Sequence, residues 1–335
     1  MAHSLTHLGI GKIRGLDQIA TPEGVFTMCA ADHRGSLQKM LSPANPDAMG
    51  YEQMVEFKLL MVETMAPHAS AVLLDPIYGA AQCIAEGVLP GSTGLLVSLE
   101  ATGYTDSAER RRTEIEPGWG VDQIKRMGAS AVKLLIYYHP DVQDVSAAQR
   151  ELVERVSAEC AAEDIPLLVE TVSYPVGGQK RPSPEFAADL PRLVVGTARE
   201  VSTLSIDVLK AEFPADADYE KDEGRMLEYC RQITEASPVP WVVLSGGVDY
   251  RCFLRQVEIA CRGGASGYLA GRAVWQEVVK TQDQTERRRF LETTAADRLK
   301  ELAEVATRFG VPWRQRLASR IPSATQIPEG WHVGY

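Results

Sequence analysis

The feature that most constrains the fold is a regular alternation of short apolar runs with longer amphipathic segments. Eight apolar runs occur, and they cover residues 25–32, 71–76, 94–100, 131–138, 166–174, 204–213, 240–247 and 266–274. Several are continuously apolar, which is typical of parallel strands covered on both faces. Between them, residues 146–164 and 249–264 have apolar positions at helical spacing. Ser146 is expected to cap the first of these helices, and the pair Gly263-Gly264 to end the second.

Eight β/α units within about 250 residues favour a single-domain α/β fold, the TIM (β/α)8 barrel. A doubly wound open sheet is the alternative, because a count of strands cannot show closure. The expected organisation is an N-terminal segment over residues 1–24, the barrel over 25–310 and a C-terminal tail over 311–335.

Composition excludes several classes of protein. The 335 residues carry a formal charge of −10, which argues against general nucleic-acid binding. No apolar run approaches the roughly 20 residues that span a bilayer, so no membrane partner is expected. The first residues do not resemble a signal peptide, and the six cysteines are dispersed without a CxxC pair. These features predict a soluble cytoplasmic protein with reduced thiols.

Charged residues recur at the ends of the predicted strands, which is where barrel enzymes place their active sites. They are Asp32, His33 and Arg34 after the first strand, Asp75 after the second, Glu100 after the third, Glu170 in the fifth, and Lys210 and Glu212 in the sixth. Each one alone can be a capping carboxylate or a surface charge. Their recurrence on successive units predicts a catalytic face.

The ends of the last two predicted strands are rich in glycine. Ser245, Gly246 and Gly247 follow the seventh strand, and Gly271 and Arg272 follow the eighth. Loops in these two places often bind phosphate in this fold, through backbone N–H groups and an arginine. The alternative is that the glycines only form a tight turn.

Lys210 is the least expected residue in an apolar strand, because a lysine is rarely buried without a partner. As a nucleophile it must be an uncharged amine, a form that desolvation and a nearby cation such as Lys133 favour. A salt bridge to Glu212 is the structural alternative. The residues alone indicate a phosphosugar enzyme that can form a Schiff base.

Several ordered blocks resemble a known family. The segments "AADHRGSL", "LLVETVSYP", "SIDVLKAEFP", "VVLSGGV" and "YLAGRAVW", spread over roughly residues 26–276, are similar to those of class I tagatose-1,6-bisphosphate aldolases. That family also includes bacterial sulfofructosephosphate aldolases and is more distantly similar to class I fructose-bisphosphate aldolases. The resemblance implies a homo-oligomer that needs no cofactor and cleaves a phosphorylated ketose.

The resemblance also implies roles for individual residues. Lys210 falls on the Schiff-base lysine, Glu170 on the acid/base carboxylate and Lys133 on a second active-site lysine. Asp32 matches an aspartate that contacts substrate near the cleaved bond. A carboxyl in a partly apolar barrel mouth is expected to have a raised pKa, which suits Glu170 to proton transfer.

Other positions match or depart from the family pattern. Ser245 and Arg272 match phosphate-binding positions, whereas His33 stands where these aldolases usually have glutamine and Ala101 where they usually have lysine. The departures leave the particular substrate open. The expected products are dihydroxyacetone phosphate and glyceraldehyde 3-phosphate, and the alternatives are a sulfofructosephosphate aldolase and a catalytically silent phosphosugar-binding barrel.

The far end of a substrate needs its own polar or anion site. Candidates are Arg110 to Arg112, in the loop after the third strand, and the pair His33 and Arg34. Tyr335 resembles the catalytic C-terminal tyrosine of some fructose-bisphosphate aldolases, although a structural tail is the favoured interpretation. The six histidines are dispersed, so no metal is expected, and "GIGKIRG" at 9–15 has the wrong glycine spacing for dinucleotide binding.

Overall fold

The computed structural model describes residues 7–335, in which eight parallel strands close into a barrel in chain order. The strands are β1 Phe26–Ala30, β2 Ala71–Leu74, β3 Gly94–Ser98, β4 Ala131–Tyr137, β5 Leu167–Val172, β6 Val208–Ala211, β7 Trp241–Leu244 and β8 Gly267–Ala270. Each lies inside a predicted run. β1 pairs with both β2 and β8, which confirms the barrel and excludes the open sheet. Residues 1–6 of the expected N-terminal segment lie outside the described residues.

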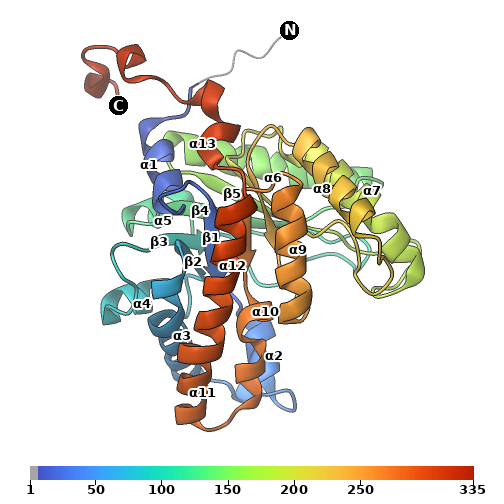
Figure 1. The fold of residues 1–335 in the computed structure, drawn as a ribbon. Helices are drawn as coiled ribbons and strands as arrows, with labels where there is room; N and C mark the ends of the chain where they lie inside the picture. Colours follow the sequence, from blue (N-terminus) through green and yellow to red (C-terminus); the bar gives the residue numbers. More distant parts are fainter. Residues whose placement is uncertain (1–6) are drawn as a thin grey trace.

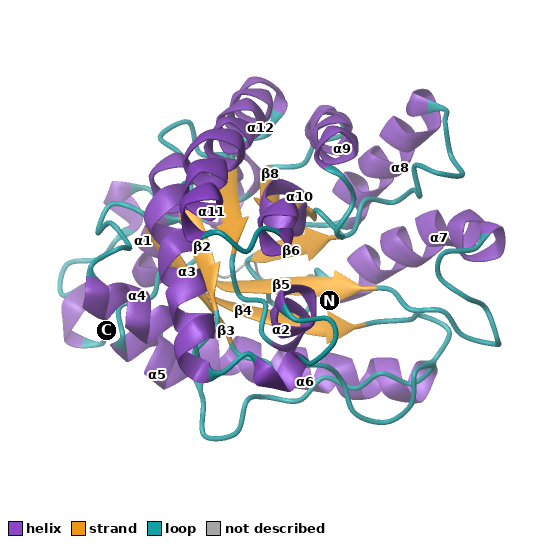
Figure 2. Ribbon diagram, turned by 90° about the horizontal axis from the view of Figure 1, so that it is seen from below, coloured by secondary structure: helices purple, strands orange, loops and turns teal. Residues whose placement is uncertain are grey.

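Helices surround the strands on all sides (Figures 1 and 2). They are α1 Ile10–Gln18, α2 Gly35–Leu41, α3 Tyr51–Met65, α4 Ala80–Glu86, α5 Val121–Arg126, α6 Gln143–Ala162, α7 Pro184–Val201, α8 Glu223–Ala236, α9 Tyr250–Arg262, α10 Arg272–Trp275, α11 Gln284–Phe290, α12 Ala296–Phe309 and α13 Trp313–Arg316. A π-helical segment, Leu291–Ala295, joins α11 to α12. None of these helices is long and apolar enough to cross a membrane.

Two helix boundaries test the sequence expectations. α9 ends at Gly263, as predicted. The N-cap prediction for Ser146 is wrong, because α6 begins three residues earlier and the Ser146 hydroxyl instead donates to the carbonyl of His139 at 2.6 Å. The helix starts early because the chain after β4 turns at His139, which brings that carbonyl under the first turn.

The strands are buried on both faces, as their continuous apolar runs predict. All residues of β1, β2, β3, β6, β7 and β8 are buried. Trp241 on β7 and Tyr268 on β8 are among the largest fully enclosed side chains.

The two ends of the barrel differ in what covers them. α1 and the C-terminal residues lie at one end, whereas α2 and α10, which follow β1 and β8, lie at the other (Figure 1). At the first end the Tyr335 hydroxyl donates to Asp164 at 2.6 Å, and Asp164 also accepts from the backbone of Gly11. The idea of Tyr335 as a catalytic residue is therefore wrong, because it lies at the amino ends of the strands.

Candidate active site

A cavity of about 390 Å³ opens at the carboxyl ends of the strands. Most of the predicted site residues line it: Asp32, His33, Arg34, Lys133, Glu170, Lys210, Ser245, Gly246, Gly271 and Arg272, but not Gly247. The barrel therefore brings together side chains that are up to 240 positions apart in the chain, as residues 32 and 272 show. Residues from seven of the eight strand ends contribute to this one site.

Lys133 occupies the centre of a carboxylate cluster. It is only the third residue of β4, but its long side chain carries Nζ up to the mouth. Nζ lies 2.9 Å from Asp32 Oδ2 and 3.1 Å from Glu170 Oε2, and it also contacts Glu100. Burial alone lowers the pKa of Lys133, but the three surrounding carboxylates outweigh it and hold the pKa well above its ordinary value. The three carboxylates thus favour the charged form of Lys133.

Lys210 and Glu170 face each other on adjacent strands. The register pairs these residues directly between β5 and β6, and Lys210 Nζ lies 2.9 Å from Glu170 Oε2. Glu212 instead accepts hydrogen bonds from Arg181 and from the backbone of Ser173, each at 2.7 Å. The alternative pairing of Lys210 with Glu212 is therefore wrong. One oxygen of Glu170 is shared between two lysines.

The expectation of a raised pKa for Glu170 is also wrong. Burial alone raises the pKa of this carboxyl, but the ammonium groups of Lys210 and Lys133 outweigh burial and hold it below its ordinary value. The pKa of Asp32 is lowered in the same way, mainly by Lys133 against the effect of burial. Both groups are carboxylates at neutral pH, so each is able to accept a proton.

The glycine-rich strand ends form a separate, positively charged side of the cavity. Gly246 and Gly247 have φ values of 57° and 84°, which a glycine adopts without strain. A Cβ atom on Gly247 would lie 3.0 Å from the guanidinium carbon of Arg272, so glycine allows Arg272 to lie across this turn. The Ser245 hydroxyl accepts from the backbone of Gly271 at 3.4 Å. Within residues 7–335, Arg272 pairs with no carboxylate, which leaves its charge available to an anion.

Comparisons with known proteins agree with this geometry. Residues 26–277 match the model of the DeoC/LacD family of aldolases. The chain belongs to that family. Tagatose 1,6-diphosphate aldolase 2 of Streptococcus agalactiae is 32% identical over 323 residues, covering 91% of this chain and 98% of the relative. The tagatose 1,6-diphosphate aldolase of Lactococcus lactis is 31% identical over the same shares. The resemblance inferred from the sequence blocks is confirmed, and this DeoC/LacD aldolase is an enzyme of the lyase class.

Solved structures confirm the fold of this DeoC/LacD aldolase. Fructose-bisphosphate aldolase of Plasmodium falciparum superimposes with a TM-score of 0.70 at 12% identity, covering 91% of this chain and 98% of that one. An archaeal fructose 1,6-bisphosphate aldolase gives a TM-score of 0.56 at 22% identity, covering 88% and 98%. At these identities the similarity concerns the barrel only.

Two other residues predicted to bind substrate, Arg34 and His33, make contacts within this aldolase. Arg34 donates to Glu116 at 2.7 Å and to the carbonyl of Glu100 at 2.5 Å, so its guanidinium is held by the protein. His33 Nδ1 lies 3.7 Å from Asp32, and the ring packs edge-on against Trp275. Burial, with Arg272 and other cations, lowers the pKa of His33 to about 4, so its imidazole is neutral.

The arginines predicted for the far end of the substrate lie outside the cavity. Arg110 pairs with Asp144 and Asp106, and Arg111 lies over the rings of three tyrosines at 4.7–5.5 Å. The cavity is lined instead by Arg181, which the sequence analysis missed because the loop after β5 has no recognisable motif. Glu100 was noted at a strand end, but its contact with Lys133 was not foreseen.

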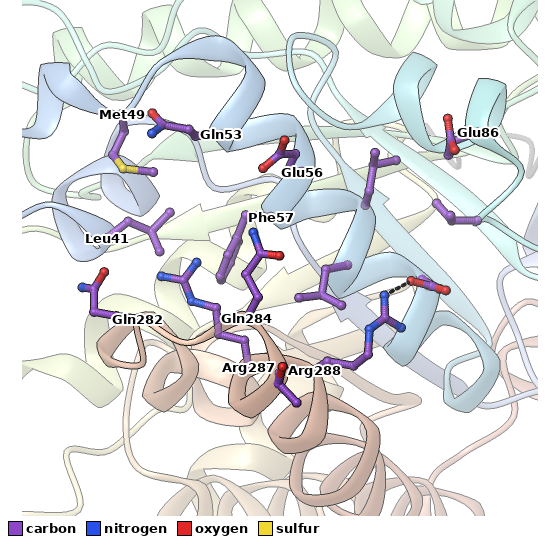
Figure 3. A pocket seen from close by; sticks show the side chains of 15 residues that line it. Leu41, Met49, Gln53, Glu56, Phe57, Glu86, Gln282, Gln284, Arg287 and Arg288 are labelled. Carbon is purple, nitrogen blue, oxygen red and sulfur yellow. Dashed lines mark hydrogen bonds and ion pairs between the residues drawn. The ribbon is translucent and has the colours of Figure 1, made fainter.

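A second hollow lies on the outside of the barrel, between α3 and α11 (Figure 3). Its volume is about 800 Å³, and it contains an ion pair between Arg288 and Glu63 at 2.8 Å. None of the residues at the strand ends lines it.

Within residues 7–335, no group of three or more histidine, cysteine or acidic residues is arranged to hold a metal ion.

Proposed function

We propose that this protein is a class I aldolase that cleaves a ketose 1,6-bisphosphate of the tagatose or fructose type. The products are dihydroxyacetone phosphate and glyceraldehyde 3-phosphate, and the reaction is reversible. The observation that carries the proposal is the buried Lys210 amine, 2.9 Å from a shared carboxylate and beside the cationic glycine-rich turns. The names of the tagatose 1,6-diphosphate aldolase relatives support the same substrate class.

The substrate is bound with its C1 phosphate against Ser245, Gly246, Gly271 and Arg272. This places the C2 carbonyl over Lys210. Lys210 first transfers its ammonium proton to Glu170, 2.9 Å away, and the uncharged amine then attacks C2 to form a bond between Nζ and C2. Glu170 returns the proton to the carbinolamine hydroxyl, which leaves as water, so an iminium remains and Glu170 is again a carboxylate. The iminium withdraws electrons from the neighbouring C3–C4 bond, which is the covalent catalysis that a lysine nucleophile supplies.

Bond cleavage requires removal of the proton from the C4 hydroxyl. A carboxylate does this, and Glu170 is in reach of both Lys210 and the space above it. The C3–C4 electron pair moves into the iminium, the aldehyde leaves, and the resulting enamine is protonated at C3 by the same carboxyl group. Hydrolysis of the imine releases dihydroxyacetone phosphate. Lys133 and Asp32 orient the hydroxyls and stabilise negative charge.

A second candidate substrate is a sulfofructose 1-phosphate, which would give sulfolactaldehyde in place of glyceraldehyde 3-phosphate. Position 101 lines the cavity and is alanine, where the family usually has lysine. A sulfonate carries one negative charge, whereas a phosphate carries about 1.5 to 2 at neutral pH, so it needs fewer cations. Rates of cleavage of tagatose 1,6-bisphosphate, fructose 1,6-bisphosphate and sulfofructose 1-phosphate, measured side by side, rank the three.

The test of the mechanism is borohydride trapping with dihydroxyacetone phosphate, followed by intact mass and peptide mapping. We expect a reduced adduct on Lys210 in the wild type and none in Lys210→Met, with Lys133→Met as the matched control. An adduct on Lys133 would exchange the roles of the two lysines. No adduct, under conditions where the ligand binds, would contradict the Schiff-base mechanism and favour a silent phosphosugar-binding barrel.

We also propose that the enzyme acts in the cytoplasm as a homo-oligomer. All six cysteines are free, and five of them are buried, as expected of a protein kept in a reducing compartment. Light scattering coupled to size-exclusion chromatography measures the oligomeric state, and a monomer at micromolar concentration would contradict this part.

A further inference from the structure

A further buried lysine lies just outside the active site. Lys58 is on α3, Asp75 follows β2, and both side chains are completely enclosed. Lys58 Nζ contacts Asp75 Oδ2 and donates to the carbonyl of Ala31 at 2.6 Å. The other Asp75 oxygen accepts from the backbone N–H groups of Ile77 and Tyr78 at 3.0 and 2.8 Å. Neither Lys58 nor Asp75 lines the catalytic cavity.

Stability does not account for such a pair. Removing two charges from water is expensive, and replacing a buried ion pair by apolar residues of similar size is often neutral or stabilising. The alternative explanation lies in what the pair holds in place. Asp75 ties the pair to the turn after β2, and α3 supplies the lysine, so the ammonium is a fixed point between two elements.

The group held by this fixed point is the end of β1. Ala31 directly precedes Asp32, whose carboxylate lies 2.9 Å from Lys133. The preceding carbonyl, that of Ala30, accepts from the indole N–H of Trp275 at 3.1 Å. Two successive carbonyls are therefore fixed from opposite sides, one by α3 and one by α10. The peptide that carries Asp32 has little freedom to rotate.

We propose that Lys58 and Asp75 are positioning residues for Asp32. Through the Ala31 carbonyl they set the backbone orientation at which the Asp32 carboxylate meets Lys133 and the substrate hydroxyl. The inference rests on the proposed aldolase function. Displacement of a catalytic group by about 1 Å can cost on the order of 100-fold in rate. An effect of that size on catalysis explains why a buried ion pair would be kept at this place, whereas its contribution to stability does not.

The experiment uses the neutral double variant Lys58→Met/Asp75→Asn, in which methionine keeps the length and asparagine keeps an acceptor for the turn after β2. The matched control is Lys12→Met/Asp207→Asn, which removes the buried pair at the opposite end of the barrel, where Nζ and Oδ2 are 2.7 Å apart. We measure the melting temperature, kcat and KM for tagatose 1,6-bisphosphate, and borohydride trapping with dihydroxyacetone phosphate.

We expect the Lys58→Met/Asp75→Asn protein to fold and to form the Lys210 adduct, with kcat reduced by about 10- to 100-fold. The control keeps the wild-type kcat. In an Asp32→Asn background, the Lys58→Met/Asp75→Asn changes should cause no further loss of kcat, because the device acts only through Asp32. A purely structural role would lower the melting temperature and leave kcat per folded molecule unchanged, or would add to the Asp32→Asn loss; either result overturns the inference.

Failure of the proposed function and failure of the positioning role give different results. If the wild type neither cleaves the sugar nor forms an adduct, the proposed function fails, whereas an active wild type with an equally active double variant refutes the positioning role alone. If the double variant does not fold, Trp275→Phe provides the test, because it removes the hydrogen bond to Ala30, at the expense of some buried ring volume, and keeps an aromatic ring beside His33. A lowered kcat that is again absent in Asp32→Asn supports the inference, and an unchanged kcat contradicts it.

Discussion

The two ends of the barrel both contain buried lysines paired with carboxylates, but the pairs are arranged differently. At the amino ends of the strands, Lys12 of α1 meets Asp207 alone, and Asp207 also accepts from the backbone of Leu167 at 2.9 Å. At the carboxyl ends, Lys133 and Lys210 both contact Glu170, and Lys133 contacts Asp32 and Glu100 as well. The amino ends thus contain a closed pair, whereas the cavity at the carboxyl ends contains a shared network, with the closed Lys58–Asp75 pair just outside it.

The difference shows what an ion pair needs in order to do chemistry. In the Lys12–Asp207 pair, each residue has one charged partner, so the pair has a single stable arrangement and the lysine has no second carboxylate to which it could transfer a proton. A carboxylate shared by two lysines keeps a second partner when one lysine reacts. In the proposed mechanism, Lys133 therefore still holds Glu170 in place while Lys210 forms a covalent bond. This division follows the general rule that barrels use one end for stability and the other for catalysis.

The largest expected effect is on catalysis at the mouth. Glu170→Gln removes the shared carboxylate, and loss of one positioned acid/base typically lowers the rate by about 10²–10⁴-fold. We expect that loss in kcat for ketose bisphosphate cleavage, with dihydroxyacetone phosphate still bound. Asp207→Asn, at the other end, is the matched control and should keep kcat in the folded protein. Near-normal turnover by Glu170→Gln would remove Glu170 from the mechanism.

A substitution at the amino ends of the strands should lower the stability of the protein and leave catalysis unchanged. Lys12→Met leaves Asp207 buried without its partner, and breaking a buried pair in this way costs about 3–5 kcal/mol. We expect that decrease in the free energy of unfolding measured with urea, and an unchanged kcat below the unfolding transition. A fall in kcat of the folded protein would show that the two ends are coupled and would contradict the division between them.

Much of this comparison is visible in the sequence, because strand ends and charges follow simple rules. The period of the apolar runs predicts eight strands, and the polar residues that follow them, such as Lys210 and Arg272, are those that line the cavity. The closely spaced glycines after β7 similarly indicate the turn that lies against Arg272. In these places, local sequence and tertiary structure impose the same requirement.

The sequence does not show which charged side chains from distant elements pair with a given residue. Asp75 looks like a catalytic residue at a strand end, yet Lys58 of α3 neutralises it, and no pattern in α3 distinguishes Lys58 from a surface lysine. Burial of Glu170 is apparent from the sequence and predicts a raised pKa. The sequence does not show that Lys133 and Lys210 both contact this carboxylate, and these contacts lower its pKa. Arg181 enters the cavity from a loop whose path depends on the whole barrel.

A smaller effect concerns the neutral histidine at the mouth. The pKa of His33 is about 4 in the folded protein and near 6.5 in an unfolded chain, so the unfolded state gains a proton first as pH falls. The stability contribution is complete above pH 6.5 and is lost between about pH 6.5 and 4, by up to about 3 kcal/mol. Urea unfolding of wild type and His33→Gln at several pH values measures it. We expect the variant to lose less stability on acidification; parallel curves would mean that the pKa of His33 is the same in the folded and unfolded states.

The smallest effect is expected at the C-terminus. Tyr335→Phe removes an exposed hydrogen bond to Asp164, and such a bond contributes no more than about 1 kcal/mol. Because Asp164 holds the start of α1 at the amino end of the barrel, the change should leave kcat and KM unaltered and lower the melting temperature slightly. Asp164→Asn is the stronger control, since Asp164 also accepts from the backbone of Gly11 and Lys12. A large fall in kcat for Tyr335→Phe alone would show that the tail reaches the mouth during turnover, and the separation of the two ends would then hold only for the resting enzyme.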